Sequence, residues 1–201
     1  TNYVQDGSFE SYTCCWSQYG DMEYCGVTTE AAAEGEHSFK IFGEIDKVKY
    51  IQQLVNVPSD SQSFVFSAFA KASSLCLNQA TQFRISAKIR YTDGTWDEEK
   101  HSNFNSLETG WQLAAVGLCK SRANSSKQID KVLIKAEYSK NLGDVYFDNL
   151  KLTQGNYSKQ YVENHYYVRR GDTNYPIESI TEIKYTKSGI THNVSTSSNG
   201  V

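Results

Sequence analysis

Three consecutive carboxylates, Asp97, Glu98 and Glu99, form the densest group of acid–base side chains in the sequence. A pair of carboxylates on either side of a glycosidic bond would suit hydrolysis. Neighbouring residues on a strand, however, point to opposite faces of a sheet, so these three cannot flank one bond. The four histidines have no metal-ligand spacing, and no GxSxG, HExxH or phosphate-loop motif occurs. The sequence therefore predicts no enzyme activity, and its chemistry has to be sought in groups that bind.

One further carboxylate, Asp148, lies within a segment that otherwise alternates apolar and polar residues, DVYFDNLKL at 144–152. Burying a charged carboxylate is unfavourable unless hydrogen-bond donors or a cation compensate for the lost water. Asp148 therefore either takes part in a metal site or accepts hydrogen bonds from backbone N–H groups. Its position alone leaves both alternatives open.

Period-2 alternation predicts the elements that must position these groups. Apolar residues alternate with polar ones over several segments that end in turn residues. In one of them a favoured hairpin dipeptide, Asp93-Gly94, follows the alternation. TTEAAAEGE at 28–36 contains helix formers, but Gly35 would end a helix within two turns, so we expect a loop. The pattern predicts an all-β fold, an antiparallel β-sandwich, with strands within 37–44, 49–57, 63–72, 82–96, 127–139 and 144–152.

Composition limits the class of protein. The 201 residues are 39% hydrophobic, enough for one core of roughly 150 residues and an appendage. A net charge of −3 and dispersed Lys and Arg argue against a nucleic-acid binder. No apolar run approaches the ~20 residues of a membrane span. We expect a domain over 1–153 and, over 154–201, an extension or linker with a possible hairpin turning at Ser188-Gly189. Because the sequence starts at Thr1 without a signal peptide, we expect a piece of a larger protein.

The five cysteines cannot all pair within one chain. No CxxC pair occurs, which argues against structural zinc. We expect mostly reduced thiols that serve as small apolar side chains. A bridge from Cys14 or Cys15 to Cys25 remains an alternative.

Several motifs occur in a recognisable order: NYVQDGSFE at 2–10, Trp16, EGEHSFKIFG at 34–43, FVFSAFAKA at 64–72, TGWQ at 109–112 and VYFDNLKL at 145–152. In this order, residues 2–152 resemble carbohydrate-binding modules of families 4, 9 and 22, which have a galactose-binding-like jelly-roll fold. One position departs from the family pattern, because Ser38 runs directly into Phe39 without the usual glycine. The continuation GNYSKQY also resembles modules of large secreted bacterial proteins with Rhs/YD repeats.

The resemblance implies a noncatalytic, polysaccharide-binding module of a secreted or cell-surface bacterial protein, monomeric and tethered to other domains. The alternative is a scaffolding or protein-interaction β-sandwich in an adhesin-like or Rhs-like polypeptide, because a fold does not fix a function.

The resemblance also implies a structural calcium ion between the two ends of the domain. Calcium takes 6 to 8 oxygen ligands at roughly 2.3–2.6 Å. Glu10 and Asp148 would supply carboxylates, with Asp6, Ser38 and Glu36 as further contributors.

A sugar-binding site needs planar aromatic side chains for stacking and polar groups for the hydroxyls. The predicted hydrogen-bonding residues are Gln52 and Arg84. Trp111 is expected in the core, whereas a tryptophan near a loop tip is uncommon without a contact to make. The predicted stacking residues are Trp96, Trp16, Tyr19, Tyr24, Tyr50 and Tyr91.

Overall fold

A computed structural model describes residues 1–11 and 15–155, together with the backbone of four short stretches nearer the C-terminus, 169–170, 173–174, 182–187 and 190–195. Apart from the short 3-10 helix η1 (Arg122–Asn124), the regular structure of these residues is all strand. The strands are β1 (Ser17–Tyr19), β2 (Gly26–Thr28), β3 (Ser38–Gly43), β4 (Tyr50–Asn56), β5 (Ser63–Ala72), β6 (Gln82–Tyr91), β7 (Lys100–Phe104), β8 (Gln112–Cys119), β9 (Ile129–Ser139), β10 (Gly143–Gln154), β11 (Arg169–Arg170), β12 (Thr173–Asn174), β13 (Glu182–Lys187) and β14 (Ile190–Ser195).

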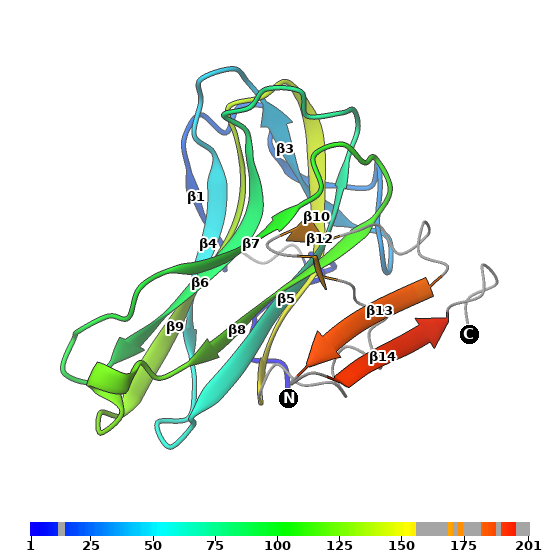
Figure 1. Cartoon of the computed structure of the whole chain (residues 1–201). Coiled ribbons are helices and arrows are strands. Elements are labelled where there is room, and N and C mark those ends of the chain that lie inside the picture. Colours follow the sequence, from blue (N-terminus) through cyan, green and yellow to red (C-terminus); the bar gives the residue numbers. More distant parts are fainter. Residues whose placement is uncertain (12–14, 156–168, 171–172, 175–181, 188–189, 196–201) are drawn as a thin grey trace.

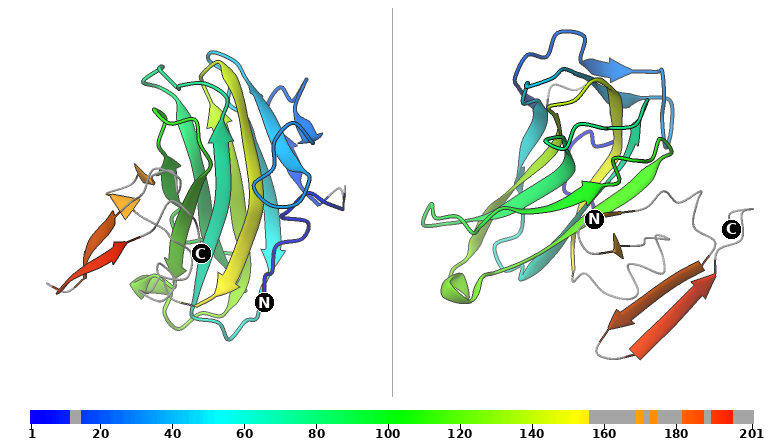
Figure 2. Two further views of the ribbon diagram at one scale, coloured as in Figure 1. Left: turned by 90° about the vertical axis from the view of Figure 1, so that its right-hand side faces the viewer. Right: turned by 45° about the horizontal axis from the view of Figure 1, so that its top comes forward.

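Two sheets pack face to face (Figures 1 and 2). The back sheet has the order β2-β3-β10-β5-β8, and all its pairs are antiparallel. The front sheet has the order β1-β4-β9-β6-β7, again antiparallel, and continues with β12, which is parallel to β7, and with β11. The predicted all-β antiparallel sandwich is therefore confirmed.

The strands predicted from alternation correspond to β3, β4, β5, β6, β9 and β10. Residues 28–36 contain no helix, as expected. The predicted C-terminal hairpin is present as β13 and β14, which pair antiparallel, although its turn at 188–189 lies outside the described residues. Strand β10 runs to Gln154, and the division between a domain and an extension near that point stays a prediction.

The core lies between the two sheets and follows the alternation of the strands. On β6, Phe83, Ile85, Ala87 and Ile89 all point inward and are buried, as the sequence predicts. Phe83 contacts Phe147 of β10 edge to face, with ring centroids 6.0 Å apart. Fully burying a side chain of this size contributes about 1.5–3 kcal/mol, so these rows account for much of the driving force for packing the sheets.

The first residues of the chain pack against β10. The backbone N–H of Tyr3 donates to the Leu152 carbonyl at 2.9 Å, and the N–H of Leu150 donates to the Gly7 carbonyl at 2.8 Å. The side-chain oxygen of Asn2 accepts from the N–H of Leu152 at 2.9 Å. Segments almost 150 residues apart in sequence are thus held side by side, and β10 is fixed on both edges and along its end (Figure 1).

The described cysteines Cys15, Cys25, Cys76 and Cys119 are free thiols, and Cys14 lies outside the described residues. Cys25 accepts a hydrogen bond from the N–H of Phe42 at 3.2 Å, and burial raises the pKa of its thiol. Among the described residues no helix is long and apolar enough to cross a membrane.

Substituting Gly43 tests how closely β3 approaches the turn before β10. A Cβ atom at Gly43 would lie 2.3 Å from the Gly143 carbonyl oxygen and 2.5 Å from that of Asn141. We expect Gly43→Ala to lower the free energy of unfolding by about 3 kcal/mol through overpacking. Gly94→Ala is the control, because Gly94 has a φ of +84° but open space around it, so the expected loss is about 1 kcal/mol. Urea titration measures both, and equal losses would contradict the close approach.

Candidate functional site

Polar and aromatic side chains occupy the outer face of the front sheet. Residues opposite each other in neighbouring strands point to the same face, and the register gives two adjacent rows across the sheet. The first row places an aromatic pair at one edge and an ion pair in the middle, and the second adds amide, ammonium and imidazole groups. These rows, called the polar face below, consist of Tyr19, Tyr50, Glu137, Arg84 and Asn103 in one, and Ser17, Gln52, Lys135, Ser86 and His101 in the other.

An aromatic pair forms one edge of the polar face. The rings of Tyr19 and Tyr50 stack with centroids 4.6 Å apart and an interplanar angle of 8°. Tyr19 is 54% exposed, so a ligand can reach the pair. The Lys135 ammonium lies 5.1 Å from the Tyr50 ring centroid and forms an ion pair with Glu99, at 2.8 Å between Nζ and Oε2. The two rings therefore present a fixed flat surface beside a cation.

A buried ion pair occupies the centre of the polar face. Arg84 donates from Nε to Oε1 of Glu137 at 2.9 Å, and the hydroxyl of Ser139 donates to the other carboxylate oxygen at 2.9 Å. Glu137 is buried, whereas Arg84 is partly exposed. A guanidinium has five N–H donors, and this contact uses one of them. The pair holds Arg84 in position with donor capacity left for a ligand.

A hollow of about 470 Å³ opens at the β6–β7 end of the polar face. It contains Arg84 together with side chains from β7 and from the loops on either side. Most of its wall consists of amide, hydroxyl and imidazole groups, which suit a polyhydroxylated ligand better than an apolar one. Its lining includes Gln79, Thr81, Gln82, Arg84, His101, Asn103 and Leu107.

Trp96 lies farther along the same face. It forms an isolated antiparallel β-bridge with Arg90, across the turn at Asp93-Gly94 that follows β6. The Lys88 ammonium is 4.6 Å from its ring centroid and the Arg90 guanidinium carbon is 5.8 Å away. Trp96 is 38% exposed. Arg90 is six residues beyond Arg84 on β6, which is about 20 Å at the usual strand rise. Trp96 and the tyrosine pair could thus meet only an extended ligand.

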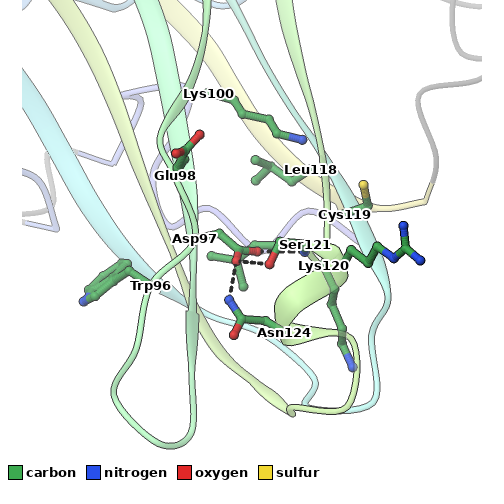
Figure 3. A pocket seen from close by; sticks show the side chains of 11 residues that line it. Trp96, Asp97, Glu98, Lys100, Leu118, Cys119, Lys120, Ser121 and Asn124 are labelled. Atoms are coloured by element: carbon green, nitrogen blue, oxygen red, sulfur yellow. Dashed lines mark hydrogen bonds between the residues drawn. The ribbon is translucent and has the colours of Figure 1, made fainter.

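Asp97, the first of the three consecutive carboxylates, has a structural role. Both Asp97 oxygens accept hydrogen bonds, from Tyr91 Oη (2.5 Å), the Ser121 hydroxyl (2.6 Å), Asn124 Nδ2 (2.7 Å) and the Ser121 N–H (3.1 Å). Burial raises the pKa of Asp97, but these hydrogen bonds outweigh it and leave the pKa below its usual value. Burial and the nearby Asp97 raise the pKa of Tyr91 to about 12. Figure 3 shows Asp97 turned toward Ser121 and Asn124, and Trp96 turned away from them.

A second hollow, of about 540 Å³, lies around Asp97 (Figure 3). Lys100, Lys120 and Arg122 are among its lining residues. Lys100 and Lys120 point in different directions in Figure 3, so these two lysines do not converge on one point.

The structure gathers some predicted ligand-binding residues and separates others. Tyr19, Tyr50, Gln52 and Arg84 belong to the polar face, and Trp96 lies on the same side of the front sheet. Three others lie elsewhere, as described next.

Tyr91 is fully buried in the core, where no ligand can stack on it. Trp16 packs on Phe9, with centroids 5.9 Å apart, and its indole N–H donates to the Asp6 carbonyl at 3.1 Å. Tyr24 is 72% exposed but lies against Phe42 of the back sheet.

Six residues of the polar face were absent from the predicted ligand-binding set: Ser17, Ser86, Lys135, Glu137, His101 and Asn103. Lys135 and Glu137 occupy outward positions of β9, which the alternation with Ile134 and Ala136 could have identified. His101 and Asn103 lie on β7, a strand that no alternation of apolar and polar residues predicted. Their place opposite Ser86 and Arg84 follows only from the pairing of β7 with β6.

Glu10, one of the two main residues of the predicted calcium site, is bound by a loop. Its Oε1 accepts the backbone N–H groups of Glu36 and His37 at 2.8 and 2.9 Å. Its Oε2 lies 2.7 Å from Nδ1 of His37. These hydrogen bonds lower the pKa of Glu10. The His37 side chain makes the largest contribution, and the two backbone N–H groups add to it.

Asp148 is bound by the same loop. Its Oδ2 accepts the N–H groups of Ala33 at 2.7 Å and Glu34 at 3.0 Å, and its Oδ1 accepts the N–H of Asn149 at 2.6 Å. The side chain is fully buried. Burial raises the pKa of Asp148, and Glu10 adds to this effect. The arrangement of Glu10, Asp148 and the N–H groups of residues 33–37 is called the amide clasp below.

The residues of the amide clasp do not fit a calcium ion in this geometry. A carboxylate offers about four lone-pair sites. On Glu10 and on Asp148, three of these sites are already taken by the donors just described. The Ser38 hydroxyl donates to the Ala31 carbonyl at 2.6 Å, Asp6 accepts from the Ser11 N–H, and Glu36 is exposed. Across the described ranges, no group of three or more His, Cys, Asp or Glu side chains could hold a metal. Calcium binding stays a prediction.

Comparison with known proteins finds the fold but no family. No family model and no curated protein matches the sequence. The enzymatically active domain of bacteriophage CBA120 tailspike protein 4 matches with a TM-score of 0.55 and 16% identity, over 77% of this chain and 21% of the tailspike chain. This chain therefore spans about a fifth of that protein.

Two carbohydrate-binding modules match over nearly their whole length. TmCBM61, in complex with β-1,4-galactotriose, has a TM-score of 0.52 and 14% identity, over 77% of this chain and 99% of the module. A family 16 module has a TM-score of 0.51 and 18% identity, over 76% of this chain and all of the module (100%). At these identities the likeness shows the β-sandwich fold, which carbohydrate-binding modules share with an enzyme domain.

The amide clasp predicts how calcium affects stability. Because N–H donors already compensate both carboxylates, we expect the melting temperature to be the same, within about 2 °C, in excess calcium and in a strong chelator. A tight structural ion would instead stabilise the fold by a few kcal/mol. Differential scanning calorimetry measures the shift. A calcium-dependent rise of several degrees would show that the loop opens to admit the ion and would support the calcium prediction.

The amide clasp also predicts a pH dependence. The pKa of Glu10 is lowered from 4.5 on folding, so its stabilising contribution is present above that value and is lost as the pH falls through the folded pKa. Asp148 acts in the opposite sense, because its pKa is raised. We therefore expect wild type to be more stable than Glu10→Gln at pH 7 and the difference to shrink toward about pH 3. Urea midpoints at both pH values measure it, and a constant difference would contradict the role of Glu10.

Proposed function

We propose that this chain is a noncatalytic carbohydrate-binding module and that the polar face is its binding surface. The observation that carries the proposal is the exposed, stacked Tyr19–Tyr50 pair beside a row of fixed polar groups on an open sheet face. Sugar rings have apolar faces that stack on flat aromatics and rims of hydroxyls that require donors and acceptors. The polar face offers both within neighbouring strands.

The mechanism we propose is stacking at one edge and hydrogen bonding across the sheet. From β1 to β7 there are four inter-strand spacings of about 4.8 Å, roughly 19 Å in all, a length suited to a short oligosaccharide. Gln52 and His101 provide hydrogen-bonding groups in the second row. Arg84, fixed by Glu137, is preorganised, which reduces the entropy lost on binding.

The hollow lined by Arg84, His101 and Asn103 would receive the far end of such an oligosaccharide. Trp96 would contact only a longer chain that runs along β6. These placements favour a polysaccharide over a free monosaccharide as the ligand.

The comparisons support this proposal through the fold, since two modules of the carbohydrate-binding type match over nearly their whole length. We further propose a secreted or cell-surface bacterial parent protein in which this chain is a monomeric, tethered module, from the resemblance of its motifs to families 4, 9 and 22. An Rhs-like parent would fit the continuation after residue 154. The fold itself is compatible with these contexts and with others.

A protein-interaction or scaffolding module is the second candidate. Leu54 is 44% exposed on the outer side of the front sheet, in the row next to Gln52, and it faces Leu133 of β9. An apolar contact surrounded by polar residues resembles the apolar core and polar rim of protein interfaces. A binding experiment separates the two candidates.

Tyrosine substitutions test the polysaccharide proposal. We expect Tyr50→Ala and Tyr19→Ala each to weaken retention in polysaccharide affinity gels about tenfold, since losing a stacking contact costs about 1.4 kcal/mol. Tyr24→Ala is the matched control, because Tyr24 is more exposed but lies in the turn before β2, against Phe42 of the back sheet.

Calorimetric melting confirms that all three variants fold. Failure of wild type to be retained on any polysaccharide would favour the scaffolding candidate. An equal loss in Tyr24→Ala would place the binding surface elsewhere.

A further inference from the structure

The outer side of the front sheet carries a group of cations on two neighbouring strands. β6 turns Arg84, Lys88 and Arg90 outward, and β9 turns Lys131 and Lys135 outward. All five side chains are partly exposed, and together they are called the cation strip below. Two of them belong to the polar face, and the other three extend it along β6 and β9.

Three carboxylates form ion pairs with the cation strip. Arg84 and Lys135 each pair with a carboxylate of their own. Arg90 and Lys131 share Asp130, at 3.4 and 3.5 Å between nitrogen and oxygen. The five cations thus exceed these partners by two positive charges, although the whole chain has a net charge of −3.

Lys88 has an aromatic partner. Its ammonium lies 4.6 Å from the ring centroid of Trp96, and it makes no ion pair with the residues that the structure describes. Burial raises the pKa of Glu99, but Lys135, and to a smaller extent Ser86 and Lys88, outweigh burial and lower it. Glu99 therefore belongs mainly to Lys135, and the charge of Lys88 is left for a ligand.

The cations are held in place, as a binding surface requires. Trp96 lies against both Lys88 and Arg90, whose guanidinium carbon is 5.8 Å from the ring centroid. Lys131 donates from Nζ to the side-chain oxygen of Asn56 at 2.9 Å. Long side chains that are already positioned lose less conformational entropy when they bind an anion.

Each aromatic surface of this face has a cation beside it. Lys135 lies beside the Tyr50 ring, and Lys88 and Arg90 lie beside Trp96. A sugar ring stacked on either surface would therefore bring its substituents next to a positive charge. Ammonium and guanidinium groups form strong hydrogen bonds with carboxylates and similar oxyanions. A neutral sugar would instead displace water from an unpaired charge without replacing it, which is unfavourable.

We propose that the ligand is an acidic polysaccharide, whose sugars carry carboxylate or sulfate groups that bind to the cation strip. This inference rests on the proposed function and adds the chemical class of the ligand. Charges spaced along a polymer suit the strip, because Arg84 and Arg90 are about 20 Å apart along β6. The carboxylates within the strip, such as Asp130, would repel a chain with a phosphate at every unit, so a polysaccharide fits better than a nucleic acid.

Polygalacturonate and its methyl ester test the proposal, because esterification removes the charge and keeps the backbone. Carrageenan and neutral galactan make the corresponding pair for sulfate groups. In affinity gels we expect wild type to be retained at least tenfold more strongly by one of the acidic polymers than by its neutral counterpart. We expect this retention to weaken as NaCl rises from about 50 mM to about 500 mM, because salt screens the attraction.

The outcomes separate this inference from the proposed function. Equal retention on the neutral and the acidic polymers would overturn the acidic ligand and leave polysaccharide binding intact. No retention on any polysaccharide would contradict the proposed function itself. Retention on single-stranded DNA that exceeds retention on every acidic polysaccharide would identify a nucleic acid as the ligand and overturn the inference.

Lys88→Gln makes the test specific, because it removes a positive charge without leaving an ion-pair partner behind. We expect it to weaken retention on the acidic polymer about tenfold, whereas Lys88→Arg keeps the charge and should preserve retention. Lys71→Gln is the matched control, since Lys71 lies on β5 of the back sheet and its loss changes the net charge equally. Calorimetric melting confirms that each variant folds. Equal losses in the two Gln variants would contradict the role of the cation strip.

Discussion

The compensation of one buried carboxylate is the constraint on which much of this structure depends. Asp148 lies in β10, the central strand of the back sheet, where no water reaches it. Three backbone N–H groups compensate its charge, and two of them come from the loop that leads into β3. The same loop binds Glu10, which comes directly after the N-terminal segment that packs against β10. The loop, β10 and the start of the chain are thus tied together at one point.

The two sheets use their outer sides differently. The front sheet exposes one ring of an aromatic pair and polar side chains that ion pairs hold in place. The back sheet carries apolar residues on its outer side, where Val65, Leu113 and Ala115 are buried although they do not belong to the core between the sheets. Among the described residues, the outer side of the front sheet combines fixed geometry with exposure, which is what recognition of a polar ligand requires.

Ion pairs decide what the polar face can recognise. Glu137 is buried and is held by Arg84 and Ser139, so it acts mainly by fixing the guanidinium. Lys135 is held between Glu99 and the Tyr50 ring. Asp97, in contrast, is fully occupied by hydrogen bonds that join the β6–β7 connection to η1. Charged residues close in sequence thus have unlike roles because their tertiary partners differ.

The sequence by itself determined six of the strands, β3, β4, β5, β6, β9 and β10, because alternation is a local property of each segment. The inward row of β6 and the outward positions of Gln52 and Arg84 could therefore be predicted. The sequence could not place β7 opposite β6, bury Tyr91, or put Tyr19 on Tyr50, since each depends on contacts between distant segments. The fate of Asp148 was open for the same reason. Which donors meet a buried carboxylate is decided only when residues 33 and 34 fold over β10, and that is a matter of tertiary structure.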